Sequence, residues 1–257
     1  MNKLKYTMVV CLFGLCVSAA AVAEDISAVV AWSQKVELGT LVSGVVSEVH
    51  VRQGQTVSKG DELITLDDRG FSSQVGRRLA AYEYARAALE EAKREDERAI
   101  ELYDRTVLSD FERNQALIAL HSARAGAEAA RADLIKARLD LERSVVRAPF
   151  DGVVLAVNVA PGQTIVSEWQ SQPLVTVADN RVYRARAEID AAHAEKLEQG
   201  EALRATVRRE AVQATVIYVG FEPVAQSQQG PRYELLVEIP AGEDLLRVGE
   251  MVILHME

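Results

Sequence analysis

The spacing of hydrophobic residues divides the chain into two kinds of segment. Within residues 26–66, apolar residues recur at even steps, as at Val45, Val49 and Val51, which is the period of a half-buried strand. Between residues 71 and 143 the steps alternate between three and four and proline is absent, so this segment is expected to be helical. The rest of the chain returns to short strand patterns separated by glycine and proline. The strands expected at the C-terminal end are 182–189, 203–207, 214–219, 233–239 and 251–256, with one short helix between Asp190 and Gly200.

The helical segment predicts two long helices that pack against each other. Its apolar and small residues form a seam with a 3.5-residue period, which is typical of a supercoiled helix pair. Arg78 and Asp96 interrupt the seam in the first helix, whereas the second helix has an uninterrupted seam. A break is expected between Asp104 and Ser109, and such a short break requires the helices to be antiparallel. The seam residues are Val75, Tyr82, Ala85, Leu89, Ala92, Ala99 and Tyr103, followed by Ala116, Leu120, Ala123, Ala127, Ala130, Leu134, Ala137 and Leu141.

The second helix begins with a capping signature. Ser109 and Glu112 have the S-x-x-E spacing, in which the serine oxygen accepts a helix N-terminal amide and the glutamate reaches back to the serine amide. Each helix then contains roughly 33 residues and is ~50 Å long. This length exceeds the diameter of a small β domain, so the hairpin is expected to project from the β domain that it interrupts.

One sequence motif occurs twice, once on each side of the helical segment. Residues 44–57 and 152–165 share the tripeptides Gly-Val-Val and Gly-Gln-Thr at a constant offset of 108 residues. The segments 63–66 and 174–177 also correspond. Two matching halves separated by a helical insertion predict one small β domain that both halves build together.

The first 23 residues have the layout of a secretory signal peptide. Lys3 and Lys5 precede an apolar core over 8–17, and the small residues 21–23 form a cleavage site. The alternative is a retained membrane anchor, because the whole apolar stretch covers 6–23. A full span needs roughly 20 apolar residues, so cleavage is the favoured interpretation.

Composition narrows the possible functions. Both cysteines, Cys11 and Cys16, lie in this leader, so cleavage excludes disulfides, thiol redox chemistry and thiolate metal sites. The loss of Lys3 and Lys5 would take the net charge from −9 to −11, and an acidic protein is not expected to bind nucleic acid. No metal, cofactor or catalytic constellation is expected, because the histidines have no ligand spacing. These histidines are His50, His121, His193 and His255.

The duplicated motif around a helical hairpin resembles the periplasmic adaptor proteins, also called membrane fusion proteins, of the haemolysin-D and resistance-nodulation-division (RND) efflux family. The segment 245–251 is also close to the family's Leu-x-Pro-Gly-Met signature, with Val248 where proline is usual. The resemblance implies an α+β fold, in which a long antiparallel coiled-coil hairpin interrupts a lipoyl-like β-sandwich and a small β-barrel domain follows. The domains expected are a signal peptide (1–23), a first lipoyl-like part with an N-terminal strand (24–67), the hairpin (68–144), a second lipoyl-like half (145–180) and the barrel (181–257).

A second resemblance concerns the break between the helices. Arg98, Leu102 and Ser109 match the R-x3-L-x6-S pattern of adaptors that dock onto TolC-type outer-membrane channels, which implies a docking role for these three residues. Each also has a structural explanation: Arg98 as a solvated charge and Ser109 as a helix cap. Leu102 lies one position off the seam, and an apolar residue there favours contact with a partner.

The resemblance implies a non-enzymatic periplasmic protein associated with the inner membrane. It would bridge an RND-type transporter to a TolC-type channel for export of small molecules, as a ring of three or six copies. A short form lacking most of the membrane-proximal domain is expected. Two alternatives stay open: an adaptor of an ATP-driven exporter or protein secretion system, and a lipoyl- or biotinyl-type carrier. The carrier needs a lysine at the turn joining the halves, whereas the nearest lysines are Lys59 and Lys93.

Overall fold

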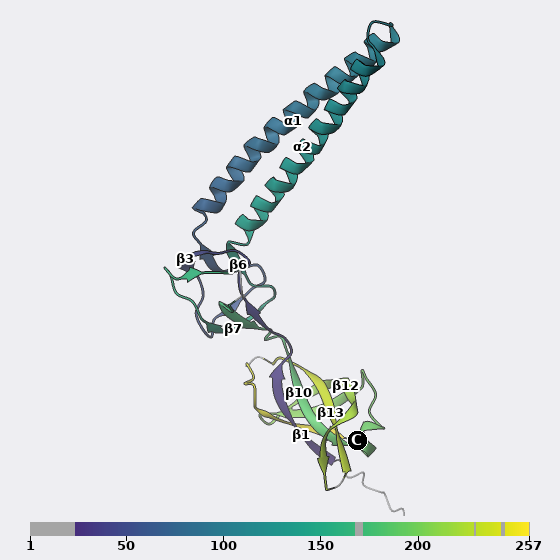
Figure 1. Ribbon diagram of the computed structural model, residues 1–257. Helices are drawn as coiled ribbons and strands as arrows, with labels where there is room; N and C mark the ends of the chain where they lie inside the picture. The colour runs from purple at the N-terminus through teal and green to yellow at the C-terminus, as the bar shows by residue number, and fades with distance from the viewer. Residues whose placement is uncertain (1–23, 168–171, 229, 243–244, 257) are drawn as a thin grey trace, which may run out of the picture. The chain divides into compact units, whose positions relative to one another are not determined.

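The computed structural model describes residues 24–167, 172–228, 230–242 and 245–256. These residues form two compact units, of which one comprises Trp32–Tyr183 with Ala241–Leu246 and the other the remaining described residues. The first unit holds two four-stranded sheets and a helical hairpin, and a closed six-stranded barrel accounts for the second (Figure 1). The α+β fold class is confirmed. The expected signal peptide lies outside the described residues.

Two sheets of four strands each form what we call the two-sheet module. Their strand orders are β2-β9-β7-β4 and β6-β5-β3-β8, so each sheet takes two strands from before the hairpin and two from after it. The expectation that both sequence halves build one β domain is therefore confirmed. The strands are β2 (Lys35–Leu38), β3 (Gly44–Val49), β4 (Thr56–Val57), β5 (Glu62–Leu66), β6 (Val145–Arg147), β7 (Gly152–Val157), β8 (Thr164–Ile165) and β9 (Val175–Ala178).

The repeated motif makes the same backbone hydrogen bond twice, each time between the halves. The Gly54 amide donates to the Val154 carbonyl at 2.8 Å, and the Gly162 amide donates to the Val46 carbonyl at 2.8 Å. The strands follow the same exchange, because β4 pairs antiparallel with β7 and β3 with β8. Each half is thus completed by the other, and neither can satisfy its own backbone groups alone.

The Gly-Gln-Thr turn recurs because its backbone geometry recurs. Gly54 has φ +83° and Gly162 has φ +86°, a region that residues with a Cβ rarely adopt. The following glutamine closes the turn: Gln55 Oε1 accepts a hydrogen bond from the Arg52 amide at 3.0 Å, and Gln163 makes the matching bond at 3.2 Å. The sequence repeat is therefore a repeat of turn chemistry.

The helices α1 (Arg69–Asp104) and α2 (Asp110–Glu142) form an antiparallel hairpin that extends from the two-sheet module (Figure 1). Every seam residue expected from the sequence is buried or half-buried, and Ala99, Ala127, Leu134 and Ala137 are buried most completely. Arg78, which interrupts the seam, forms an ion pair across the helices with Asp133 at 2.7 Å. The predicted coiled-coil pairing is confirmed.

Gly126 offers a test of the second helix. It is exposed within α2, and a Cβ built on it meets no atom within 4 Å. Gly126→Ala should raise the free energy of unfolding by about 1 kcal/mol, because alanine loses less backbone entropy in a helix. Thermal and urea denaturation followed by circular dichroism would measure this change. Gly76→Ala in α1, where space is equally open, should act alike, and a lowered Tm in both would contradict the prediction.

The barrel corrects one expectation. The strand β1 (Glu24–Trp32) was expected beside the first lipoyl-like part, but it pairs antiparallel with β14 from Glu24↔Met256 to Val29↔Met251. Its Ala28 and Val30 are fully buried. Closure of the barrel explains this position, because β1 covers the edges that β14 and β10 would otherwise expose. The barrel order is β1-β10-β13-β12-β11-β14, with β10 (Val182–Asp190), β11 (Ala202–Val207), β12 (Glu210–Ser227), β13 (Gly230–Pro240) and β14 (Met251–Met256).

The short helix of the barrel is α3 (Ala191–Ala194). Its expected N-cap is confirmed, because Asp190 Oδ1 accepts a hydrogen bond from the His193 amide at 2.9 Å. The expected stop at Gly200 is wrong. Gly200 instead has φ +91° and donates its amide to the Val216 carbonyl, which places it in the turn leading into β11.

Candidate functional site

The tip of the hairpin is built from interlocking backbone caps. At the end of α1 the Thr106 amide donates to the Tyr103 carbonyl at 2.8 Å, and the Val107 amide donates to the Leu102 carbonyl at 2.9 Å. These two bonds define a Schellman motif, which needs a left-handed residue at its turn. Thr106 occupies that position with φ +59°. A β-branched residue is strained there, where glycine is usual.

The start of α2 is fixed by the predicted capping box. The Ser109 amide donates to Glu112 Oε2 at 3.0 Å, and the Glu112 amide donates to Ser109 Oγ at 3.4 Å. The hydrogen bonds from the Ser109 backbone and hydroxyl lower the pKa of Glu112, so this carboxylate stays ionised at neutral pH. The expected capping role of Ser109 is confirmed.

Side chains also connect the two helices at the tip. Arg113 of α2 lies over the ring of Tyr103 of α1, with 5.4 Å between the guanidinium carbon and the ring centroid, a cation–π contact. A hydrogen bond between the Tyr103 hydroxyl and the Asp110 carboxylate raises the pKa of Tyr103. The tip is thus a compact, preorganised turn.

The three residues predicted to dock all lie at this tip, within the last two turns of α1 and at the N-cap of α2. Arg98 is exposed and forms an ion pair with Glu95 at 2.7 Å, one turn earlier on the same helix. Leu102 is half-buried rather than fully exposed, so its side chain helps to pack the end of α1. Because Leu102 is half-buried, only part of its side-chain surface is available to a partner.

Two large apolar residues at the tip were missed by the sequence reasoning. Phe111 is 75% exposed and Val107 is 68% exposed. Phe111 could have been found from the sequence, because the seam continues through Ala116 and leaves it on the outer face of α2. These residues give the tip an uncovered apolar surface on either side of the Ser109 N-cap in the sequence.

Thr106→Gly tests the geometry of the tip. Glycine adopts the left-handed region without steric cost, so the substitution should stabilise the hairpin by about 1 kcal/mol, less the entropy that glycine adds to the unfolded chain. Thr106→Ala keeps a Cβ and should not gain this stability. Urea denaturation compares the unaltered protein with the two variants. Equal free energies of unfolding of the Gly and Ala variants would show that the backbone at Thr106 is not strained.

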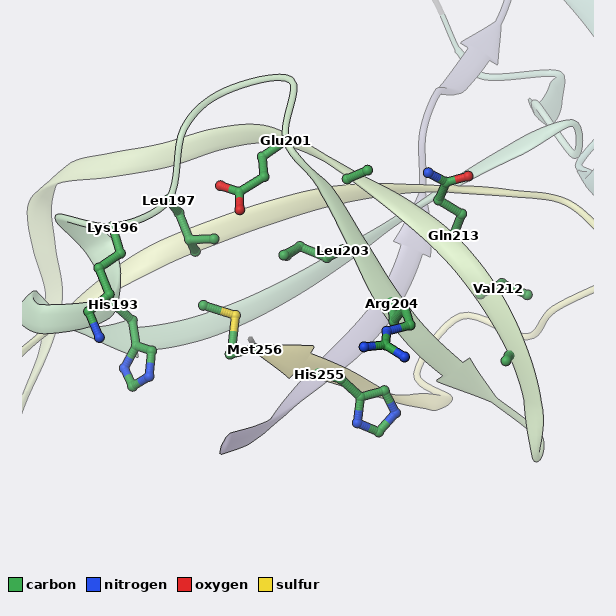
Figure 2. Close-up of a pocket in the computed structure, with 12 residues that line it drawn as sticks. His193, Lys196, Leu197, Glu201, Leu203, Arg204, Val212, Gln213, His255 and Met256 are labelled. Atoms are coloured by element: carbon green, nitrogen blue, oxygen red, sulfur yellow. The ribbon is translucent and has the colours of Figure 1, made fainter. Parts of the chain in front are cut away.

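The barrel holds a pocket of about 550 Å³ at the end where α3 lies (Figure 2). Its lining combines the cationic side chains of Lys196 and Arg204 with the apolar side chains of Leu203 and Met256. Its His255 is held by hydrogen bonds on both ring nitrogens, to Asp25 at 2.6 Å and to Thr206 at 2.8 Å. Such bonds join neighbouring strands of the barrel.

Among the described residues, no group of three or more His, Cys, Asp or Glu side chains gathers closely enough to hold a metal ion. Within the same residues, no helix combines the length and apolar character that crossing a bilayer requires.

Comparison with known proteins places the chain in a family. Residues 34–179, more than half of the chain, match the family of CzcB-like barrel-sandwich hybrid domains. The chain belongs to this family, and its architecture is that of the periplasmic adaptors, or membrane fusion proteins, which are adaptors rather than enzymes.

Solved structures share this fold over 91% of the chain. One is a MacA–MexA chimeric protein with the hairpin domain of Pseudomonas aeruginosa MexA (23% identity, 81% of that chain, TM-score 0.60). Another is the membrane fusion protein Spr0693 from Streptococcus pneumoniae (19% identity, 98% of that chain, TM-score 0.63). A third is MacA from Actinobacillus actinomycetemcomitans (23% identity, 78% of that chain, TM-score 0.57).

Proposed function

We propose that this protein is the periplasmic adaptor of a tripartite efflux pump, which bridges an inner-membrane RND-type transporter to a TolC-type outer-membrane channel. The observation that carries the proposal is the rigid, capped tip at the end of a long hairpin. This tip combines the Arg98, Leu102 and Ser109 pattern with uncovered apolar residues. A long helical arm is suited to spanning distance, and a few residues at its end are enough to set partner specificity.

The docking chemistry follows from the tip residues. Arg98 supplies a cation that can leave its exposed ion pair with Glu95 at little cost, because exposed ion pairs contribute about 0–1 kcal/mol. Val107 and Phe111 supply exposed apolar surface that a partner can cover, and the half-buried Leu102 adds the part of its side chain that stays accessible. Ser109 is occupied by the capping box, so its contribution is to fix the start of α2. Docking would therefore rest on one charge and an apolar patch held in a fixed geometry.

The transporter would bind at the barrel, not at the hairpin tip. The barrel would face the inner-membrane partner, and three or six copies side by side would enclose a conduit for small molecules. An ATP-driven exporter could be served by the same architecture, so the transporter class is the main alternative. A carrier function would need a modified lysine between the halves, where this chain continues instead from β5 into α1.

Photo-cross-linking in living cells tests the proposal at both ends. A photoreactive amino acid replacing Phe111 should capture an outer-membrane channel protein, and purification of cross-linked complexes should recover one inner-membrane transporter. The transporter's own sequence then decides between a proton-driven and an ATP-driven pump. The same reagent at Ile135, an exposed residue near the base of α2, is the control. Capture of no outer-membrane protein from Phe111 would refute the docking role.

A further inference from the structure

Strand β12 continues well past its neighbour in the barrel. Strand β11 pairs with residues 210–215 of β12, whereas β12 from Tyr218 to Ser227 pairs only with β13. Residues 217–227 of β12 therefore pair on one side alone, and we call them, together with residues 228–236 that follow, the aromatic arm; its β13 part is flanked by β10, as the Arg186–Glu234 ion pair at 2.7 Å shows. Its outer strand, residues 217–227, carries a single charged residue, Glu222.

The aromatic arm exposes large apolar side chains. Phe221 is 90% exposed, Val224 is 56% exposed and Tyr218 is 41% exposed. The rings of Tyr218 and Phe221 contact each other edge to face, with 6.5 Å between their centroids. Such a pair is a preformed apolar surface, and its members lose little conformational entropy when a partner covers them.

The backbone of the aromatic arm is not available for strand addition. Three register shifts interrupt the pairing of β12 with β13, and Pro223 lacks an amide donor. Gly220 holds the strands close together, because a Cβ there would lie 3.0 Å from the Glu234 nitrogen and 3.2 Å from its oxygen. The arm therefore offers side chains rather than a strand edge to its partner.

Strand directions place the aromatic arm at one end of the barrel. The Ala241 amide donates to the Arg181 carbonyl, so β13 ends where β10 begins. The ring of Trp32 lies 5.4 Å from that of Tyr183, so β1 also ends there. Consequently β1 and β13 both start at the opposite end, beside α3, with β10 between them in the barrel. Residue Glu24 and the turn of the aromatic arm thus share one end of the barrel.

We propose that the aromatic arm contacts the lipid surface of the inner membrane, with Phe221, Tyr218 and Val224 buried at the boundary between headgroups and acyl chains. The apolar stretch 6–23 directly precedes Glu24 in the chain, so a retained anchor would hold this same end of the barrel at the bilayer. Aromatic side chains favour that boundary.

Charge decides the kind of lipid surface. The charged residues of the aromatic arm are Glu222, Arg232 and Glu234, and the chain as a whole is acidic. The arm therefore has no excess of positive charge with which to attract anionic headgroups. The contact is apolar, and it should prefer zwitterionic lipids and resist salt. This inference does not depend on which transporter or channel the protein serves.

The test uses the fluorescence of F221W in the purified full-length protein with vesicles of zwitterionic lipid. Lipids brominated on the upper acyl chain should quench this tryptophan, and high salt should leave the quenching unchanged. A tryptophan at Glu210, exposed at the other end of the same strand, is the matched control and should not be quenched. Trp32 and Trp169 are replaced by phenylalanine in both proteins to remove background.

Vesicle flotation gives an independent readout. Y218S with F221S should reduce the vesicle-bound fraction by about tenfold, whereas M251S, a similarly exposed apolar site on β14, should not. Absence of quenching at position 221, or unchanged flotation of the double variant, would overturn the proposal. Unchanged flotation with lost cross-linking to an inner-membrane protein would assign the aromatic arm to a protein interface instead. Tip substitutions such as L102D should leave lipid binding intact, so the two proposals fail separately.

Discussion

Gly152→Ala should lower the free energy of unfolding of the two-sheet module by about 3 kcal/mol or more. A Cβ at Gly152 would lie 2.2 Å from the carbonyl oxygen of Ala178 and 3.0 Å from its carbonyl carbon. These atoms belong to the backbone of β9, the neighbour of β7, and cannot move away without breaking the sheet. Gly152→Val, with a larger side chain, should prevent folding of the module.

The sequence repeat supplies the matched control for this experiment. Gly44 is the counterpart of Gly152 in the first copy, but a Cβ there would meet Leu66 Cδ1 at 3.3 Å. The end of a leucine side chain can shift, so Gly44→Ala should cost about 1 kcal/mol. Urea denaturation of the two variants, followed by near-ultraviolet circular dichroism, measures the difference. Equal free energies of unfolding of the two variants would show that the close backbone approach at Gly152 does not exclude a Cβ.

Leu102→Asp should abolish export while the protein remains folded in the periplasm. A charge within an apolar docking patch costs about 2 kcal/mol or more, which corresponds to about 30-fold weaker binding. Arg98→Asp should have a similar effect, because it reverses the charge offered to the partner and places it beside Glu95. Drug susceptibility of cells carrying each variant is the measurement, with abundance checked by immunoblotting.

Half-burial of Leu102 makes a stability control necessary. Ile135→Asp places the same charge at an exposed apolar position near the base of α2, and it should leave export intact. The Tm of each purified variant separates loss of docking from loss of folding. Unchanged susceptibility with the folded Leu102→Asp protein would refute the docking role.

Much of the fold follows from local sequence patterns. The seam residues of both helices, the capping box at Ser109 and the glycines of the Gly-Gln-Thr turns could be predicted because each depends on neighbours a few residues away. The meeting of the two halves could be predicted for a different reason. The same Gly-Val-Val and Gly-Gln-Thr segments recur on both sides of the helical insertion, and such matching halves are expected to build one domain together.

The candidate site could be predicted only in part. The position of the tip and the role of Ser109 follow from the sequence, and docking by Arg98 and Leu102 stays a prediction. The sequence could not show that the side chains of Val107 and Phe111 are more exposed than that of Leu102, because exposure depends on how the turn directs each side chain. Thr106 shows this directly, since a threonine gives no sequence signal of a left-handed backbone.

By itself the sequence determined the helical hairpin, its antiparallel pairing and the two-part β module, because periodicity and turn residues act over short distances along the chain. Tertiary structure alone decided that β1 closes the barrel and that Gly152 cannot accept a Cβ. It also decided that Phe221 stands uncovered at one end of the barrel. The physical reason is that strand partners, close backbone approaches and side-chain exposure are set by segments far away in the sequence.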